Sequence, residues 1–291
     1  MLPISPSPRS ARSYAFCEKL ARREAGNFYP AFRLLPAPQR RAMCALYAFL
    51  RIADDIGDGP GTSDEKAGRL DAWQRSLEQA LAGIDSHPLH PALRHTITKY
   101  GIPLEYLTAV LDGIRMDLAE VRYNTFDELY PYCYRVASAV GLACIHIWGF
   151  SDDRAKQYAE SAGIAFQLTN ILRDLGEDAA RQRVYLPRSE LEQFGYSVEQ
   201  IVRGERTGSF RAMMRFQADR ANRYYDQALH LTPLLSPTGQ AVFLVLLRTY
   251  RGLLDEIARR DFDVFSTRVS LSRWWKLGIL LRTLPVRWGL V

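Results

Sequence analysis

The segment YAFLRIADDIGD, residues 47–58, carries three carboxylates within five residues at the end of an apolar helical pattern. Side chains three and four residues apart share one face of a helix. That face would hold an aromatic ring, a base and acids: Tyr47, Arg51, Asp54 or Asp55, and Asp58. Carboxylates this close repel one another unless a cation or a basic partner lies between them. The pattern ends at Gly59-Pro60-Gly61, where acids also oppose the helix dipole at about 0.3–1 kcal/mol each.

A second segment, FQLTNILRDLGEDAARQRVYLP at residues 166–187, repeats this combination. Its oxygen donors follow a three- and four-residue rhythm, and such donors suit Mg²⁺. Arginines nearby could grip phosphate oxygens in forked geometry. The two segments predict a Mg²⁺–diphosphate site between facing helices, the alternative being two solvated faces with i,i+4 ion pairs. The donors are Gln167, Asn170, Asp174 and Asp178, and the arginines are Arg51, Arg173, Arg181 and Arg183.

Outside these segments, apolar residues recur at helical spacing and period-two alternation is nearly absent. The longest apolar run, Ala241–Leu247, is far too short to span a bilayer. We expect an all-α protein with one helical domain at residues 14–282, a flexible N-terminal tail at 1–13 and a C-terminal tail at 283–291. The expected helices cover residues 14–25, 38–57, 64–82, 90–99, 104–120, 126–149, 152–178, 188–193, 197–203, 208–231, 237–260 and 270–281.

Composition restricts the possible partners and the cellular compartment of the protein. The formal net charge of +6 could serve nucleic acid, an anionic membrane surface or phosphorylated substrates. The four cysteines form no CxxC pair, which predicts free thiols in a reducing compartment and a cytoplasmic location. Nucleic-acid binding is not expected, because no recognised module is present. The sequence leaves the oligomeric state open.

The C-terminal segment is basic, since no acid follows Asp263. Two interpretations stay open. A basic segment interleaved with Trp suits peripheral contact with an anionic membrane, or it forms a last helix packed on the bundle with solvated charges. The basic and Trp residues are Arg268, Arg273, Trp274, Trp275, Lys276, Arg282, Arg287 and Trp288.

The chain resembles the squalene/phytoene synthases from about residue 14 to residue 282. The first segment matches the DxxxD motif of that family, preceded by ALYAFLR at 45–51, and the second matches its NxxxDxxxD motif. GIRMDL (113–118), RYNTFDELYPYCYRVASAVG (122–141) and LLRTYRGLLDEI (246–257) follow in the expected order.

This resemblance implies an isoprenoid-synthase helical bundle around a central cavity, and it implies roles for individual residues. Asp54, Asp58, Asn170, Asp174 and Asp178 would carry Mg²⁺, or Mn²⁺ in its place. The diphosphate would be held by Tyr47, Arg51, Arg173 and Arg183. Gln167 would lie at the same end of the cavity, and Asn27 would be a further contact. Tyr132, Tyr134 and Tyr250 would line the cavity.

The resemblance also implies a head-to-head joining of two isoprenyl diphosphates through a cyclopropylcarbinyl diphosphate. The substrate would be farnesyl or geranylgeranyl diphosphate, and NADPH would be needed only if the reaction continues to squalene. Routes to carotenoid, hopanoid and sterol precursors all stay open. We expect Phe32 to shorten the cavity and the small Cys44 to deepen it, so C15 and C20 substrates both remain open.

Two other hypotheses predict different sequence features. A family member without activity, serving as an interaction protein, would have lost aspartates that this chain retains. A cyclising terpene synthase of related fold would also use acidic helices, but it does not predict the YCYRVASAVG (132–141) and RVYLP (183–187) segments.

Overall fold

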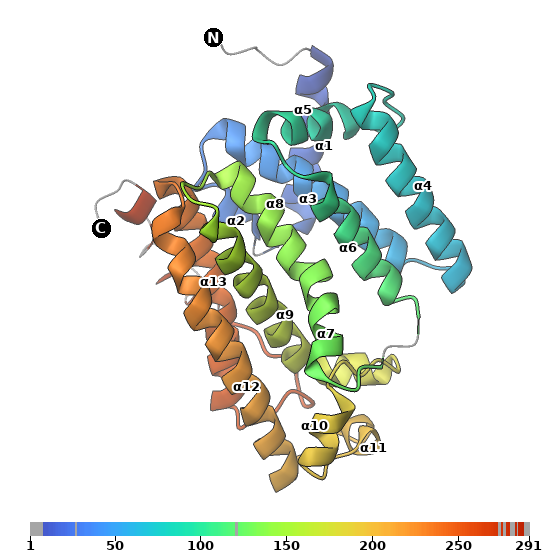
Figure 1. Cartoon of the computed structure of the whole chain (residues 1–291), viewed down its shortest axis with the longest axis vertical. Helices are drawn as coiled ribbons and strands as arrows, with labels where there is room; N and C mark the ends of the chain where they lie inside the picture. Colours follow the sequence, from blue (N-terminus) through green and yellow to red (C-terminus); the bar gives the residue numbers. More distant parts are fainter. Residues whose placement is uncertain are drawn as a thin grey trace.

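A computed structural model describes residues 8–26, 28–119, 122–272, 275, 278, 279, 283 and 285–287. The described residues form helices and no strand, and Phe150 and Leu235 form one isolated antiparallel bridge. This confirms the all-α prediction (Figure 1). The elements are α1 (Pro8–Glu24), α2 (Phe28–Phe32), α3 (Ala37–Asp58), α4 (Ser63–Leu81), α5 (His90–Tyr100), α6 (Leu104–Met116), α7 (Phe126–Cys133), η1 (Tyr134–Ser138), α8 (Ala139–Trp148), α9 (Arg154–Ala180), α10 (Arg188–Gln193), α11 (Val198–Val202), α12 (Gly208–Ala228), η2 (Leu229–Leu234) and α13 (Pro237–Arg259).

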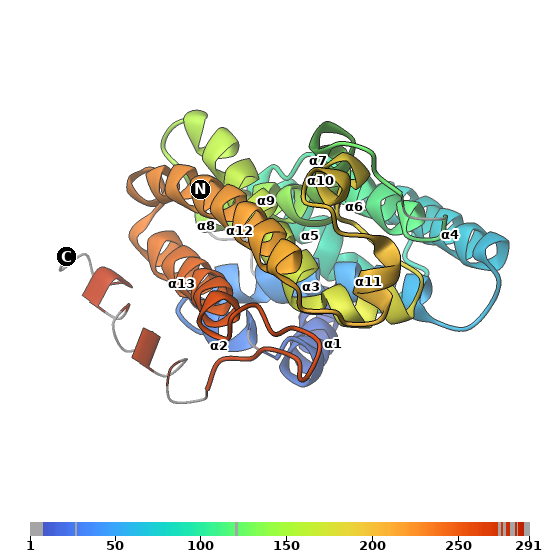
Figure 2. The same cartoon turned by 90° about the horizontal axis from the view of Figure 1, so that it is seen from below.

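Helix α9 is the central element of the bundle. It packs against α12, α8, α13 and η1, while α3 packs against α1, α5, α6 and α8. Figure 2 shows α12 and α13 along one side of the molecule and α4 at the opposite edge. Helices α3 and α9 carry the two acidic segments, so the fold places both segments on inner elements of the bundle.

Helix α1 begins at Pro8, so residues 8–13, which were expected to lie in a flexible tail, are helical. Residues 8–13 therefore belong to the bundle. Ser13 is buried, and its hydroxyl oxygen accepts a hydrogen bond from the Ala92 amide at 3.0 Å. The apolar periodicity misses this helical turn because it consists mostly of polar residues that face solvent.

Two predicted helices contain other helix types. The helix expected at 126–149 includes the π-helix η1 between α7 and α8. Pro131, which has no amide N–H, lies just before that wide turn and removes one hydrogen bond from the helical ladder. The helix expected at 208–231 ends at Ala228 and continues as the 3₁₀ helix η2. Half of the helix expected at 270–281 lies outside the described residues.

Helix α9 and η1 approach each other closely at Gly163. A Cβ atom on Gly163 would lie 2.3 Å from the Cα and 2.5 Å from the backbone nitrogen of Ser138. The Ser138 hydroxyl donates a hydrogen bond to the carbonyl oxygen of Glu160 at 2.8 Å and fastens the same contact. Only glycine fits this crossing.

The four cysteines are free, as predicted, and all four are buried. Burial raises the pKa of Cys17 and of Cys44 to about 12, so these thiols stay protonated and unreactive at neutral pH. Across the described residues, no helix combines the length and apolar character that crossing a membrane requires.

Candidate active site

A cavity lies at the centre of the bundle between α3, α8 and α9. It encloses about 1030 Å³ of space, part of which opens to solvent. Its wall is almost entirely apolar, and its charged lining residues are Arg51 and Asp54. Both lie in the C-terminal half of α3, whereas Met43, one lining residue of the opposite half, is apolar. The cavity therefore has one charged end and one apolar end.

At the charged end, Asp54 and Asp55 are both exposed, but they have different neighbours. Loss of hydration at the cavity, followed by the charge of Asp58, raises the pKa of Asp54 to about 7. Asp55 forms an i,i+4 ion pair with Arg51 at 2.8 Å. Asp55 therefore fits the alternative of a solvated helix face with an i,i+4 ion pair. Asp54 is the acid of this motif that faces the cavity.

On α9, Asp174 is held by two arginine side chains. Arg173 donates from Nε at 2.8 Å, and Arg268 donates from Nε at 3.0 Å and from Nη2 at 3.2 Å. Burial opposes ionisation of Asp174, but these hydrogen bonds outweigh it and lower the pKa. The pKa of Asp178 shifts in the opposite direction: burial and the charge of Asp174 raise it to about 6.

Asp117, which the sequence motifs did not single out, lies between the two acidic segments. Its carboxylate accepts hydrogen bonds from the hydroxyls of Tyr185 at 2.9 Å and Tyr132 at 3.1 Å. Burial raises the pKa of Asp117. Its charge contributes to the raised pKa of Asp54 and of Asp178, which shows that it is close to both. The sequence signal that could have identified Asp117 is its position as the single acid at the end of an apolar helix, in GIRMDL (113–118).

Two tyrosines that were expected to line the cavity are not in its wall. The Tyr132 ring is stacked on Tyr185 with centroids 5.0 Å apart, because its hydroxyl is drawn to Asp117. Tyr134 is half-buried, and its pKa is raised by burial and by the charge of Glu160.

Tyr250 and Cys44 also lie behind the wall. The Tyr250 ring stacks on the lining residue Phe166, with centroids 4.5 Å apart. Cys44 is fully buried near Cys17 of α1, so it cannot deepen the cavity as predicted. Phe32 does line the cavity, and so does Met43, which precedes Cys44 in the sequence. The period of a helix cannot tell which of two adjacent buried residues faces a hollow.

The remaining predicted residues lie on or beside the two acidic segments. Tyr47 lines the cavity, and Asn170 donates to the Oε1 atom of Gln167 at 3.4 Å. Arg183 donates from Nη2 to the backbone carbonyl oxygen of Asp117 at 3.0 Å, and it lines a small hollow beside Asp58 together with Lys66 and Arg181. Asn27 lies outside the described residues.

The donors at this end fit a divalent cation. The Oδ1 atom of Asn170 is buried without a hydrogen-bond partner, and loss of hydration, followed by nearby like charges, raises the pKa of Asp54 and of Asp178. No three His, Cys, Asp or Glu side chains in the described part of the chain form a ready cluster for a metal ion. Mg²⁺ does not need one, since it keeps several waters and bridges one or two carboxylates to phosphate.

The raised pKa of Asp54 predicts an unusual effect of Asp54→Asn on stability. Between about pH 4 and pH 7 the folded protein binds more protons at this group than the unfolded chain, so its contribution to stability is lost as the pH rises. With a metal chelator present, we expect Asp54→Asn to be more stable than the unchanged protein at pH 8 by roughly 1 kcal/mol, because solvent at this exposed side chain screens much of the repulsion that the raised pKa implies. Urea unfolding at pH 8 and pH 5 measures this, and an equal difference at both pH values would contradict it.

The fold and the site define an all-helical enzyme with a charged mouth over an apolar cavity. The chain belongs to the squalene/phytoene synthase family, whose model matches residues 21–275. It is therefore a prenyltransferase.

Individual relatives extend over nearly the whole chain. A 15-cis-phytoene synthase from Synechococcus elongatus is 38% identical over 292 residues, covering 95% of each chain. Among solved structures, a dehydrosqualene synthase has a TM-score of 0.88 at 26% identity, covering 96% of this chain and 98% of its own. Squalene synthase HpnC from Alicyclobacillus acidocaldarius has a TM-score of 0.81 at 28% identity, covering 86% and 94%.

Proposed function

We propose that this protein joins two molecules of geranylgeranyl diphosphate head to head and releases a phytoene-type hydrocarbon. The observation that carries the proposal is the cavity, which is charged at one end and apolar along the rest of its length. That shape suits a substrate with a diphosphate head and a long prenyl tail. The similarity to a phytoene synthase over 95% of both chains supports the C20 substrate.

The charged end would hold the diphosphate groups. Arg51 lines this end, Arg173 pairs with Asp174 and Arg183 lines the hollow beside Asp58. All three could donate paired N–H groups to phosphate oxygens. Mg²⁺ bound there would neutralise the diphosphate and favour its departure as a leaving group. The residues that would hold the ion are Asp54, Asp58, Asn170, Asp174 and Asp178.

The apolar wall would protect the allylic cation that remains after the diphosphate departs. Phe28, Phe32 and Phe166 line the cavity, and aromatic faces stabilise a nearby cation by about 0.5–2 kcal/mol. The C2–C3 double bond of the second substrate attacks C1 of the cation, and loss of one proton closes a cyclopropane. Departure of the second diphosphate, rearrangement and loss of another proton give the hydrocarbon. No reductant is consumed on this route.

The decisive experiment incubates the pure protein and Mg²⁺ with geranylgeranyl or farnesyl diphosphate, each with and without NADPH. We expect a C40 product from geranylgeranyl diphosphate that does not depend on NADPH. A C30 product alone, or a product that stops at the cyclopropyl diphosphate, would correct the substrate or the end point. No dimeric product from either substrate would refute the proposal.

The apolar end of the cavity should set the chain length. Cys144 on α8 lines the cavity together with Met43 and Trp148, so a larger side chain there would occupy tail space. We expect Cys144→Phe to lower kcat/KM for the C20 substrate by about tenfold or more relative to the C15 substrate. The matched variant Cys144→Ala should keep the C20 preference. An equal loss for both substrates in competition assays would show that this end does not measure tail length.

Contact with an anionic membrane remains part of the proposal for the C-terminal basic segment. Arg268, which belongs to that segment in the sequence, binds Asp174 instead. Trp275 is 39% exposed beside Gly252, whereas Arg273, Trp274, Lys276, Arg282 and Trp288 lie outside the described residues. Cosedimentation with anionic and neutral vesicles tests this contact.

A further inference from the structure

The segment that follows α13 carries Arg268 to the acidic end of α9. We call residues 261–268 the strap. Phe265 of the strap packs on α9 at Gly176, where a Cβ atom would lie 3.0 Å from the Phe265 ring, and Phe265 also meets Phe210 with ring centroids 5.3 Å apart. Three residues later, Arg268 reaches Asp174. The strap therefore connects the end of α13 with the charged mouth of the cavity.

The start of the strap has a conformation that its own sequence does not favour. Asp261 and Phe262 both have left-handed backbone angles, with φ of 54° and 59°. Left-handed φ is uncommon for residues other than glycine, and a bulky residue such as Phe adopts it at a cost in free energy. The amides of the turn cap the end of α13, since Phe262 donates to the carbonyl oxygen of Ile257 at 2.9 Å and Asp261 to that of Ala258 at 3.0 Å. Contacts from outside the strap can offset the remaining cost of the left-handed backbone.

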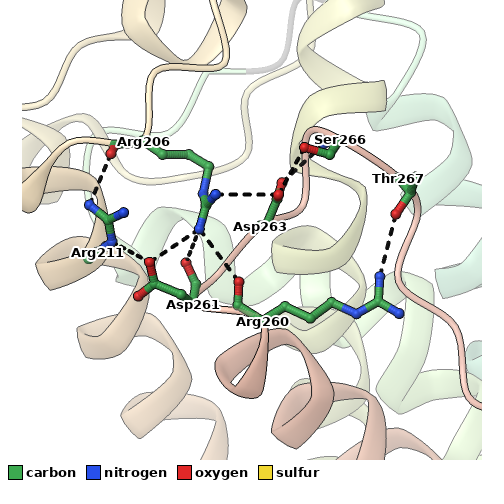
Figure 3. Close-up of polar contacts among 7 residues, drawn as sticks. All are labelled: Arg206, Arg211, Arg260, Asp261, Asp263, Ser266 and Thr267. Atoms are coloured by element: carbon green, nitrogen blue, oxygen red, sulfur yellow. Dashed lines mark hydrogen bonds and ion pairs between the residues drawn. The ribbon is translucent and has the colours of Figure 1, made fainter.

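Arg206, in the loop before α12, supplies those contacts (Figure 3). Its Nη2 atom donates to the carbonyl oxygen of Asp261 at 2.8 Å and to the Asp261 carboxylate at 3.2 Å. Its Nη1 atom donates to the Asp263 carboxylate at 3.3 Å. One planar guanidinium thus binds the backbone and two side chains of the turn, which an ammonium group could not do in the same geometry.

The neighbours of Arg206 complete this arrangement. Arg211 donates from Nε to the Asp261 carboxylate at 2.6 Å and from Nη1 to the carbonyl oxygen of Arg206 at 3.0 Å (Figure 3). Asp263 in turn accepts hydrogen bonds from the backbone N–H of Ser266 at 3.1 Å and from its hydroxyl at 2.8 Å. These bonds fold the strap back toward α9, so the chain of contacts runs from Arg206 through Asp263 to the residues next to Arg268.

We propose that Arg206 is a positioning residue for the prenyltransferase reaction: it holds the strap in the turn that places Arg268 on Asp174. The proposal rests on the proposed function, because Arg268 matters only if Asp174 belongs to the diphosphate mouth. Arg206 itself belongs to a surface loop and touches neither the cavity wall nor the acids of the mouth. The opposing possibility is that Phe262, Val264 and Val269, which are buried, hold the strap without Arg206.

The first test needs no catalysis. Hydrogen–deuterium exchange is measured in Arg206→Met and in the control Arg203→Met, which removes an exposed arginine of the same loop that pairs with Glu205. We expect the amides of residues 263–268 to exchange about tenfold faster in Arg206→Met only, with α13 and the melting temperature nearly unchanged. Unchanged exchange of the strap in Arg206→Met would overturn the proposal.

The second test asks whether Arg206 acts through Arg268. With geranylgeranyl diphosphate and Mg²⁺, we expect Arg206→Met to lower kcat/KM about tenfold and Arg268→Met about 100-fold. The double variant should match Arg268→Met within about twofold, since effects through one shared contact are not additive. A further tenfold loss in the double variant would overturn the proposal. If the unchanged protein forms no product while strap exchange still rises in Arg206→Met, the proposed function fails and the role of Arg206 in holding the strap stands.

Discussion

Asp54→Asn and Asp174→Asn should each abolish product formation, lowering kcat by about 10³-fold or more while the fold stays intact. Asp54 is the acid of its motif that lines the cavity, and Asp174 is the point where Arg173 and Arg268 converge. An amide keeps the size of the side chain but removes the negative charge that a cation needs. Product analysis under saturating Mg²⁺ measures the loss, and circular dichroism checks the fold.

The control for both variants is Asp226→Asn. Asp226 is an exposed aspartate that pairs with Arg251 at 2.9 Å, away from the cavity wall. Its replacement should leave turnover within about twofold, because exposed ion pairs contribute little. Activity within tenfold of normal in both Asp54→Asn and Asp174→Asn would mean that the metal site has been misplaced.

Gly163→Ala should destabilise the protein by about 3 kcal/mol or more, a large effect for one added methyl group. The new Cβ would lie 2.3 Å from Ser138 Cα, and a backbone atom cannot rotate away as a side chain can. The crossing of α9 and η1 would have to open, and this crossing forms part of the cavity wall. Urea unfolding gives the free energy of unfolding directly.

Gly68→Ala is the matched control for Gly163→Ala. Gly68 lies inside α4, and an added Cβ there would meet nothing within 4 Å. Alanine should therefore stabilise this helix by about 0.5–1 kcal/mol. If the two variants changed stability in the same direction, the close approach at Gly163 would not have the importance that its geometry indicates.

The sequence predicted the helical class and most helix boundaries, because apolar periodicity and the breakers between helices are local signals. It also predicted both acidic segments, since their spacing on a helix face is fixed by the helix itself. Asp117 could not be singled out, because its position between the two segments depends on how three helices pack. Arg268 is 94 residues from Asp174 in sequence, so their contact is a property of the fold alone.

Two tyrosines show that the sequence also assigned residues to the cavity wall that do not line it. Tyr132 and Tyr134 occupy the segment in which cavity residues were expected, but the wall at this point is formed by Val136 and Ala137. The π-helix η1 shifts the facing of its residues relative to a regular helix, and nothing in local periodicity predicts such a wide turn. The hydrogen bond of Tyr132 to Asp117 then fixes its direction.

The single charged end of the cavity has different consequences for the entry of the substrate and for the release of the product. A prenyl diphosphate can remain with its head in water while its tail enters, but the proposed hydrocarbon product has no polar head. Its exit past Arg51, Asp54 and the acids of α9 would bring an oily chain into contact with charged groups and water. Release of the hydrocarbon into plain buffer should therefore be slow. A lipid phase held against the mouth would act as an acceptor, and turnover measured with vesicles or detergent should exceed turnover measured without them.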